Sequence, residues 1–524
     1  MVNTDRVDEA LQRSQDHLLR LQAPAGFWLG ELEADTTITS EYLLLRHLLS
    51  IRDRDLERKA IEYLRARQGT DGSWNLYEAG AGDLSATIKA YFAMKMAGVS
   101  PTDPAMARSR DWILECGGPT QANVFTKITL AIFGQYPWGG VPAMPVEIML
   151  LPRWSYFNVW EISYWSRTVL IPLLIVMDRR PVHPVPRDAG IEEPTRFHVQ
   201  PCVSPVWDTA LAINALLASG LPSGHTALVR AASWLMDRQV DEPGDWQVKR
   251  PGLSPGGWAF QFDNPFYPDL DDTAVVAMGL HQIDHPDDDR RRTAIERGVR
   301  WLRGMQGKNG GWASFDTDQT RLLFNNIPFA DHGALLDPAT EDLTARCIEC
   351  FGRLGASRDD PAIQRGLAFL RRTQTPEGAW HGRWGVNYLY GTWSVLRGLQ
   401  AIGMGTEEPM VARAVRWLEA RQNLDGGWGE TCDSYAQTHL KGRGASGPSQ
   451  TAWALLGLMA AGEAGTPAVG RGIEFLLRTQ RADGGWDDPL WNGTGFPRVF
   501  YLQYHLYAHY FPLWALGTWR RLTR

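Results

Sequence analysis

The chain has 524 residues and a formal net charge of −6, which gives no reason to expect nucleic acid as a partner. Its length exceeds that of one compact core and predicts two or three domains. The five cysteines are too few for a disulfide framework in a chain of this size. The 23 tryptophans are more than packing alone requires, so they indicate a repeated structural device or an aromatic-lined cavity.

The start of the chain and its longest apolar run bear on location. Residues 1–6 are polar and precede an amphipathic helical pattern, so no signal peptide is predicted. The longest apolar run, residues 169–177, is too short to span a bilayer. We expect a cytoplasmic protein that is either soluble or peripheral on the cytoplasmic membrane.

One pattern recurs along the chain: an apolar helical stretch, a glutamine, a few polar residues, a glycine and a tryptophan. The glycine supplies the turn that ends a helix, and the glutamine amide can bind free backbone groups at helix ends. Internal repeats of this kind usually determine the architecture. The seven copies are Gln22–Trp28, Gln68–Trp74, Gln239–Trp246, Gln306–Trp312, Gln374–Trp380, Gln422–Trp428 and Gln480–Trp486.

Further helices lie between these repeats, and two of them are predicted to begin at Pro205 and Pro448. No run of alternating β-branched residues predicts a large sheet. Helical hairpins repeated this often predict an all-α protein in which stacked hairpins close into an α/α toroid. The Pro-rich segment 178–203 interrupts the pattern and predicts an irregular connection at a domain junction.

Three carboxylates, Asp269, Asp271 and Asp272, lie between an aromatic run at 256–263 and an apolar helix at 275–278. Mutual repulsion and burial both raise pKa values, so at least one carboxyl is expected to keep its proton at neutral pH. A dry, protonated carboxylic acid that faces aromatic rings can protonate a carbon–carbon double bond. The alternative interpretation is an Asp-rich helix N-terminus, which favourably complements the helix dipole.

One pair of thiols and one run of acidic residues in the sequence are candidate metal ligands. Cys347 and Cys350 have metal-ligand spacing, but no second pair accompanies them, so two buried helical thiols are predicted instead. The acidic run 287–289 is followed by arginines and lacks the Asp-Asp-x-x-Asp pattern of metal-dependent diphosphate ionisation. We expect no metal ligands and no organic cofactor.

Together these motifs resemble the squalene–hopene cyclase family, the class II triterpene cyclases. The repeats match the family's Gln-Trp repeat, and Asp269 to Ala274 match its catalytic acid motif. The likeness covers nearly the whole chain and includes residues 28–34, 204–209, 325–333, 383–391 and 496–510.

The resemblance implies an α/α toroid of the α6-α6 barrel type in two domains, the second shortened. Residues 1–31 plus 203–524 would form the catalytic domain with the acid motif. Residues 32–202 would form the second, incomplete domain, which ends in a Pro-rich connection at 178–202.

The resemblance also assigns roles to the charged residues. Asp271 would be the Brønsted acid that protonates a terminal alkene, while Asp269 and Asp272 would raise its pKa and orient its proton. Arg346 stands in the place of a basic partner that hydrogen-bonds the acid. Its cation alone would lower the pKa of Asp271, an effect that two neighbouring carboxylates can offset.

By similarity, an apolar polyprene, squalene, would be cyclised to hopene or hopanol in a cavity lined by aromatic side chains. Such faces stabilise a migrating cation without reacting, each by about 2 kcal/mol when desolvated. Glu41 resembles a residue in the network that receives the final proton. The lining would be Trp165, Trp207, Phe260, Phe315, Phe329, Trp384, Tyr390, Phe496, Phe500 and Tyr504.

Core packing is an equally good account of any one of these aromatic residues. In particular, Phe496, Phe500, Tyr504 and Tyr507 have the spacing of one helix face, which packing would also produce.

Two features depart from the family pattern. Residues 181–201 bridge directly to Ser204, where the family has a long helical stretch that includes a membrane-contacting helix. Lys89 stands where the family usually has a carboxylate, and a cation there would oppose a nearby carbocation. Both changes affect the terminating end, so we expect protonation and early ring closure to survive better than full pentacyclisation.

Two other functions stay open. One is a class II cyclase of a shorter polyprenoid, a C15 to C20 diphosphate or a meroterpenoid, which the shortened second domain favours. The other is a non-catalytic lipid-binding homologue, against which the intact acid motif argues. Docking to a membrane surface and formation of a homodimer also stay open.

Overall fold

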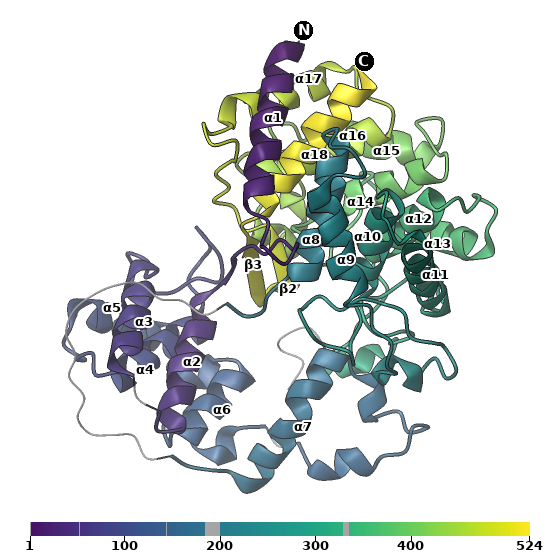
Figure 1. Ribbon diagram of the computed structural model, residues 1–524. Coiled ribbons are helices and arrows are strands. Elements are labelled where there is room, and N and C mark those ends of the chain that lie inside the picture. The colour runs from purple at the N-terminus through teal and green to yellow at the C-terminus, as the bar shows by residue number, and fades with distance from the viewer. Residues whose placement is uncertain (1, 52, 143, 184–199, 328–334, 524) are drawn as a thin grey trace.

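The computed structural model describes residues 2–51, 53–142, 144–183, 200–327 and 335–523, and their helices form two groups (Figure 1). The larger group consists of α1 Thr4–Arg20, α8 Pro205–Ala218, α9 Thr226–Met236, α10 Leu270–His281, α11 Asp288–Gly304, α12 Glu341–Arg353, α13 Pro361–Thr373, α14 Tyr388–Ala401, α15 Pro409–Glu419, α16 Pro448–Ala460, α17 Pro467–Thr479 and α18 Tyr507–Leu522. The smaller group consists of α2 Thr36–Leu48, α3 Arg54–Ala66, α4 Leu84–Met96, α5 Pro104–Glu115, α6 Val124–Ile132 and α7 Tyr164–Arg179.

Six helices of the larger group close into an inner ring. In order around the ring, α8, α10, α12, α14, α16 and α18 each pack against the next, and α18 packs back against α8. Every residue of α16 is buried, which is possible because this helix carries no charged side chain. The predicted all-α toroid of the α6-α6 type is thus confirmed for this part of the chain.

The other six helices of the larger group form an outer ring that is tied together by glutamines. At the end of α13, Gln374 Nε2 donates to the carbonyl oxygens of Gly378 at 2.9 Å and of Met410, in the first turn of α15, at 2.8 Å. Equivalent glutamines join α1 to α9, α9 to α11, α11 to α13, α15 to α17 and α17 to α1. The repeat therefore fastens each outer helix to the next around a closed circle.

The tryptophan and glycine of each repeat fix the turn after the outer helix. In six of the seven copies the indole N–H donates to a leucine carbonyl of the preceding helix, as from Trp380 to Leu370 at 2.9 Å. Gly378 has φ of +108°, and a Cβ there would lie 2.6 Å from the carbonyl oxygen of Arg413. Any other residue would be strained and would also push the neighbouring helix away.

The third repeat differs from the prediction. Gln239 Nε2 donates to Gly256 O at 2.7 Å, and it is Trp258, not Trp246, whose indole binds the preceding helix, at Leu235 O. Trp246 packs against Trp301 instead. The sequence prediction was wrong because a long loop carries a second glycine and tryptophan at the usual spacing, before the pair that closes the turn.

The smaller group uses the same hairpins without closing a ring. Gln68 joins the end of α3 to Ala105 in α5, and α2 and α4 pack together on the inner side. Most of its buried apolar residues between Leu43 and Phe133 form a core separate from that of the barrel, whereas α6 and α7 share a further core with Phe324, Leu335 and Leu336. This separation supports the division into domains at 1–31 plus 203–524 and at 32–202, which we retain as a proposal. Most of the Pro-rich connection at 178–202 lies outside the described residues.

A small sheet lies where the two helix groups meet. Its strands, β1 Leu32–Ala34, β2 Gly493–Phe496 and β3 Phe500–Tyr504, are antiparallel in the order β1-β3-β2. The expectation that Phe496, Phe500 and Tyr504 share a helix with Tyr507 is therefore wrong, since only Tyr507 lies in one. A spacing of four also keeps residues on one face of a strand, where side chains alternate with a period of two.

Gln306→Ala is expected to lower the free energy of unfolding by about 1–3 kcal/mol, because buried carbonyls lose their donor and Arg365 loses its acceptor. Urea denaturation of the purified protein measures the change. Gln364→Ala, at an exposed position on α13, is the matched control and should stay within about 0.5 kcal/mol of the wild type. Equal losses in the two variants would show that the glutamine ring does not stabilise the barrel.

Candidate active site

The acid motif lies at the N-terminal end of α10, and its three aspartates line a cavity of about 340 Å³. The cavity extends from α10 to the β2–β3 hairpin and the start of α7. Nine of the ten predicted aromatic residues line it, while Phe329 lies outside the described residues. The nine are Trp165, Trp207, Phe260, Phe315, Trp384, Tyr390, Phe496, Phe500 and Tyr504.

Asp269 is the N-cap of α10. Its Oδ1 accepts the backbone N–H groups of Asp271 at 2.6 Å and of Asp272 at 3.2 Å. The interpretation of the motif as an Asp-rich helix start is therefore correct for Asp269. It does not exclude the acid interpretation, because this cap is what points the next two carboxyls along the first turn and into the cavity wall.

Arg346 on α12 reaches Asp271 from the neighbouring inner helix. Its Nε donates to Asp271 Oδ1 at 3.0 Å, and its Nη2 donates to the Tyr390 hydroxyl at 3.4 Å. The guanidinium lies 4.8 Å from the ring centre of Trp393 and is almost wholly buried. A fixed cation thus contacts one oxygen of the predicted proton donor.

All three aspartates hold protons more tightly than exposed carboxyls do. Burial raises the pKa of Asp271 to about 6; Arg346 opposes this rise, while Asp342 and Glu349 add to it. Burial, followed by repulsion from neighbouring aspartates, raises the pKa values of Asp269 and Asp272 well above the ordinary range. At neutral pH Asp269 and Asp272 therefore retain protons, whereas Asp271, the strongest acid of the three, is mainly protonated below about pH 6.

Buried carboxylates position two of the aromatic walls. Asp337 accepts the backbone N–H groups of Ser314, Phe315 and Asp316 at 3.2, 2.8 and 2.9 Å. Asp342 accepts those of Arg383 at 2.7 Å and Trp384 at 3.2 Å. The rings of Phe315 and Trp384 are thereby held edge to face, with centroids 6.2 Å apart.

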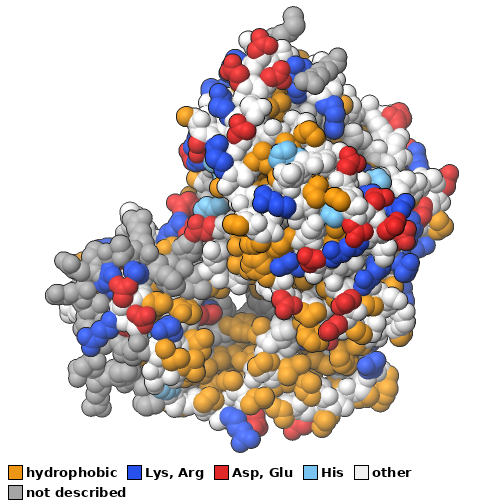
Figure 2. Space-filling model, in the orientation of Figure 1, with side chains coloured by type: hydrophobic (Ala, Val, Ile, Leu, Met, Phe, Trp, Pro, Cys, Tyr) orange, Lys and Arg blue, Asp and Glu red, His pale blue; other side chains and the backbone are white. Residues whose placement is uncertain are grey.

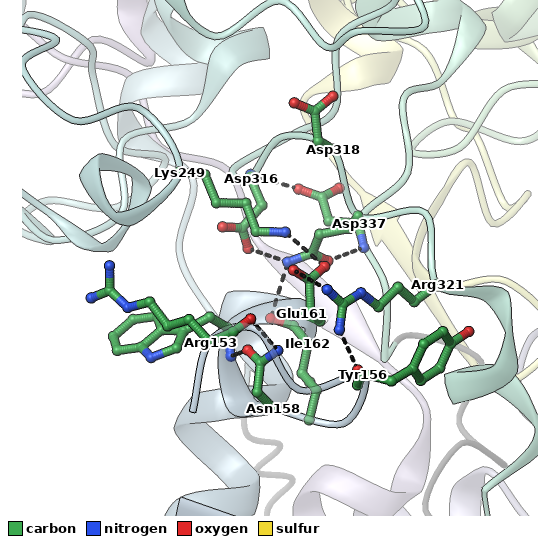
Figure 3. A network of polar contacts seen from close by, with 12 residues as sticks. Arg153, Tyr156, Asn158, Glu161, Ile162, Lys249, Asp316, Asp318, Arg321 and Asp337 are labelled. Atoms are coloured by element: carbon green, nitrogen blue, oxygen red, sulfur yellow. Dashed lines mark hydrogen bonds and ion pairs between the residues drawn. The ribbon is translucent and has the colours of Figure 1, made fainter. Parts of the chain in front are cut away.

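A polar network fastens the start of α7 to the barrel (Figure 3). Glu161 pairs with Lys249 at 2.9 Å and with Arg321 at 3.4 Å, and Arg321 also donates to Ser155 O. Asp316 Oδ2 accepts the backbone N–H of Tyr164 at 3.1 Å. These contacts place the first turn of α7, with its aromatic side chains, against the cavity.

A second cavity, of about 840 Å³, adjoins the first: both are lined by Trp165, Pro201, Phe496 and Phe500. It lies between the smaller helix group and the hairpin, where the molecule is hollowed and edged with hydrophobic side chains (Figure 2). Glu41 lies in this second cavity, not beside the acid motif.

Lys89 lines the second cavity together with Glu41. Its Nζ lies 2.6 Å from Glu41 Oε1, and its side chain is only 8% exposed. The lysine therefore does not point to solvent. The first and second cavities together are called the combined cavity here. The lysine places a buried positive charge at the end of this combined cavity that lies away from the acid.

Sequence reasoning missed several lining residues, among them Tyr164, Tyr267 and Tyr507. Tyr164 stacks on Tyr267 at 4.0 Å, and the Tyr507 hydroxyl accepts the indole N–H of Trp207 at 2.9 Å. The first two could have been found, because they adjoin Trp165 and the acid motif in sequence. For Tyr507 the only sequence signal was its spacing from Phe496, Phe500 and Tyr504.

The two thiols of α12, Cys347 and Cys350, are fully buried, as predicted. Within the described ranges no group of three or more His, Cys, Asp or Glu side chains is arranged to hold a metal ion. The polar groups among the lining residues are carboxyls, phenols, amides, indoles and the thiol of Cys202.

Asp272→Asn is expected to stabilise the protein, and by about 1–3 kcal/mol more at pH 8 than at pH 5. Asp272 is buried, and its Oδ1 has no hydrogen-bond partner among the described residues. Because its folded-state pKa exceeds its unfolded value, the folded protein binds more protons and wild-type stability falls as pH rises between the two. Urea denaturation at both pH values, with the exposed Asp263→Asn as control, tests this; a gain that does not grow with pH would contradict it.

Family models place the chain among known proteins. The squalene-hopene cyclase N-terminal domain matches residues 11–251, and the squalene-hopene cyclase C-terminal domain matches residues 203–521. The squalene–hopene cyclase of Bradyrhizobium diazoefficiens is 40% identical over 633 aligned positions, which cover 98% of this chain and 95% of that protein. That of Alicyclobacillus acidocaldarius is 40% identical over 622 positions, covering 99% of each.

These alignments run about a hundred positions beyond the 524 residues of this chain, so the relatives contain stretches that have no counterpart here. Among solved structures, the ent-copalyl diphosphate synthase from Streptomyces platensis aligns with a TM-score of 0.56 at 17% identity, over 98% of this chain and 99% of that one. This likeness supports the fold. The family models and the curated relatives together show that the chain belongs to the squalene–hopene cyclase family.

Proposed function

We propose that this protein protonates a terminal double bond of squalene and guides the resulting carbocation through ring closure to a hopene- or hopanol-type triterpene. The observation that carries the proposal is the position of Asp271, a buried acid that opens into a cavity whose other walls are mainly aromatic. The curated squalene–hopene cyclases that match nearly the whole chain support the same substrate.

Of the three aspartates, Asp271 is the best placed to give up its proton. Transfer leaves negative charge on the donor, and Arg346 Nε, 3.0 Å from Asp271 Oδ1, stabilises that charge. Asp272 Oδ1 has no such partner in the described part of the chain, and Asp269 already accepts two backbone N–H groups. We assign Asp271 as the proton donor and its two neighbours as groups that orient the proton, while burial, Asp342 and Glu349 raise the pKa of Asp271.

The reaction balances without any further reagent. The O–H bond of Asp271 breaks as its proton joins the terminal alkene carbon, which leaves a carboxylate and a tertiary carbocation. Each following double bond supplies its electron pair to the cation, so that one carbon–carbon bond forms and the charge moves onward. The last cation loses a proton to give an alkene or captures water to give an alcohol. Aromatic faces along the path stabilise the charge by about 2 kcal/mol each.

The terminating end is assigned to the second cavity. There Glu41 is the candidate acceptor of the final proton, and Lys89 forms an ion pair with it. An ammonium ion repels an approaching carbocation, an effect that the paired carboxylate offsets only in part. We therefore propose that early ring closure is better supported in this protein than formation of the last rings.

The same lysine favours a second candidate function. A buried ammonium ion at the far end of the combined cavity would suit a shorter polyprenoid with an anionic head, such as a C15 to C20 diphosphate or an acidic meroterpenoid. Glu41 argues against it, because its carboxylate already pairs with the lysine and would repel an anionic head. Squalene therefore remains the first choice.

Asp271→Asn is expected to reduce cyclisation at least about 1,000-fold, because an amide cannot supply the proton that starts the reaction. Wild type and variant are incubated with squalene and, separately, with geranylgeranyl diphosphate followed by phosphatase, and products are identified by gas chromatography–mass spectrometry. The exposed Asp263→Asn should retain wild-type activity. For the wild type, kcat/KM should fall as pH rises above about 6, where Asp271 loses its proton.

The outcomes separate the candidate functions. Cyclic products from squalene that are lost in Asp271→Asn support the proposal, and their ring count shows how far the cascade runs. Turnover of the diphosphate alone would replace squalene with the shorter substrate. A wild type inactive on every polyprene would favour a non-catalytic lipid-binding homologue.

We further propose that the protein docks on a lipid surface through α7 and the segment before it. No helix within the described ranges is long and apolar enough to cross a membrane. Large apolar side chains are nevertheless exposed there, most strongly Leu150 at 81% and Trp154 at 86%. Val169 on α7 belongs both to this exposed face and to the wall of the second cavity, so an apolar surface runs from solvent to the cavity. The patch comprises Val146, Met149, Leu150, Leu151, Trp154, Tyr156, Phe157, Val169, Ile171, Ile175, Leu322 and Leu323.

Leu150→Glu combined with Trp154→Glu is expected to weaken co-sedimentation with anionic phospholipid vesicles at least about tenfold, because two apolar anchors become charged. Turnover of detergent-dispersed substrate should change little. Leu424→Glu, which alters an exposed leucine on the barrel, is the matched control. Unchanged vesicle binding would refute docking through this patch, and loss of a dimer in gel filtration would assign the patch to contact between copies of the chain.

A further inference from the structure

A buried cluster of charges behind the acid site includes Arg346, but its other members have no part in the function described so far. On α12, Arg346, Glu349 and Arg353 follow one another at the spacing of one helix face, and Arg397 faces them from α14. Arg346, Glu349 and Arg397 are all buried, at exposures of 1%, 1% and 5%. Buried charges are costly unless each is paired, so the partners of each group show what the cluster does.

Glu349 is the common partner of the three arginines. Its Oε1 accepts from Arg397 Nε at 3.0 Å and Nη2 at 2.7 Å, and from Arg353 Nε at 2.8 Å. Its Oε2 lies 3.7 Å from Arg346 Nη1 and has no hydrogen bond among the described residues. The carboxylate is thus fixed through one oxygen and turns the other toward Arg346.

The guanidinium of Arg346 is held at each of its three nitrogens. Its Nε donates to Asp271, its Nη1 faces Glu349, and its Nη2 reaches Tyr390 and Ser394 on α14 at 3.4 and 3.5 Å. Trp393 covers the face of the group. Since a guanidinium is planar and cannot redirect one N–H without moving the others, its contact with Asp271 depends on what holds the other two corners.

We infer that Glu349 is the positioning residue of the acid site: clamped by Arg397 and Arg353, it fixes the guanidinium of Arg346 and limits how much of that charge acts on Asp271. Without Glu349, two or three buried cations would lie behind a single acid and favour its ionised form. With Glu349 in place, Asp271 can keep its proton until an alkene is present, and Arg346 can still stabilise the anion that forms.

Several charged or titratable groups surround this contact. Asp271 faces Asp269 and Asp272 at the start of α10, Tyr390 on α14, and Asp342, Arg346, Cys347 and Glu349 on α12. Of these, only Arg346 lowers the pKa of Asp271, whereas Asp342 and Glu349 raise it. The three arginines in turn hold the pKa of Glu349 down to about 2, so the carboxylate is ionised at any working pH.

The test rests on the proposed cyclisation and uses the pH dependence of kcat/KM. Activity requires protonated Asp271 and is lost as pH rises through its pKa. Glu349→Gln preserves shape but removes the negative charge, so this loss should move to lower pH by about 0.5–1 unit, with kcat falling more than KM changes. Arg353→Gln removes a cation from the same carboxylate, and the loss should move to higher pH.

Two results would overturn the inference. A merely structural role would lower activity in Glu349→Gln equally at all pH values and leave the profile in place. The second such result is an Arg353→Gln variant whose pH profile equals that of the wild type. This variant alters a partly exposed side chain and is expected to fold. In the double variant Glu349→Gln, Arg397→Gln, one charge of each sign is removed, so the profile should return toward that of the wild type.

Failure of the proposed function is distinguishable from failure of this inference. If the wild type cyclises no polyprene, the titration of Asp271 is followed instead by infrared difference spectroscopy, with the carboxyl band assigned by its loss in Asp271→Asn. The same opposite shifts in Glu349→Gln and Arg353→Gln are expected there. Identical titration in wild type and both variants would refute the positioning role whatever the substrate is.

Discussion

The structure depends on keeping three neighbouring carboxyl groups buried beside an apolar cavity. Burying an ionised carboxylate without partners costs several kcal/mol, so such a group must be neutral, capped or paired. The three aspartates use all three solutions: Asp269 caps α10, Asp272 is favoured in its neutral form, and Asp271 is paired with Arg346. We propose that Asp271 can donate its proton because burial opposes its ionisation, while the fixed cation of Arg346 stabilises the negative charge that donation leaves.

Such an arrangement needs a scaffold that does not relax around it. The acid lies on α10, its partner on α12 and the next supporting groups on α14, so the site spans three consecutive helices of the inner ring. The glutamine circle fastens the outer helices that enclose these three. The carboxyl groups of Asp337 and Asp342 lie close to the cavity, yet backbone N–H groups occupy their oxygens, and they hold aromatic walls in place without offering a base to a passing cation.

Much of this could be read from the sequence, for reasons that differ from element to element. The repeats predicted the toroid because each is local, and the acid motif stood out because three carboxylates in apolar surroundings are costly. Two predictions failed because one spacing fits two structures. In the third repeat the spacing of glycine and tryptophan fits both a loop and the turn that ends a helix, and from Phe496 to Tyr507 a spacing of four fits both a strand and a helix. Glu349 was missed because its significance arises only when α12 and α14 face each other, which no local pattern reveals.

The two ends of the combined cavity obey different physical requirements, which explains how one can change while the other stays intact. At the initiating end, Asp271 and Arg346 must stay within hydrogen-bond distance, so substitutions around them are tightly coupled. The terminating end consists of a wider cavity beside an incomplete ring of helices. The positive charge can move there as the cation rearranges, so different sets of lining side chains can stabilise it. A Lys89–Glu41 pair can persist there because each charge offsets the other. Under the proposed roles, a change on this side alters where the cascade stops, whereas a change around Asp271 decides whether it starts.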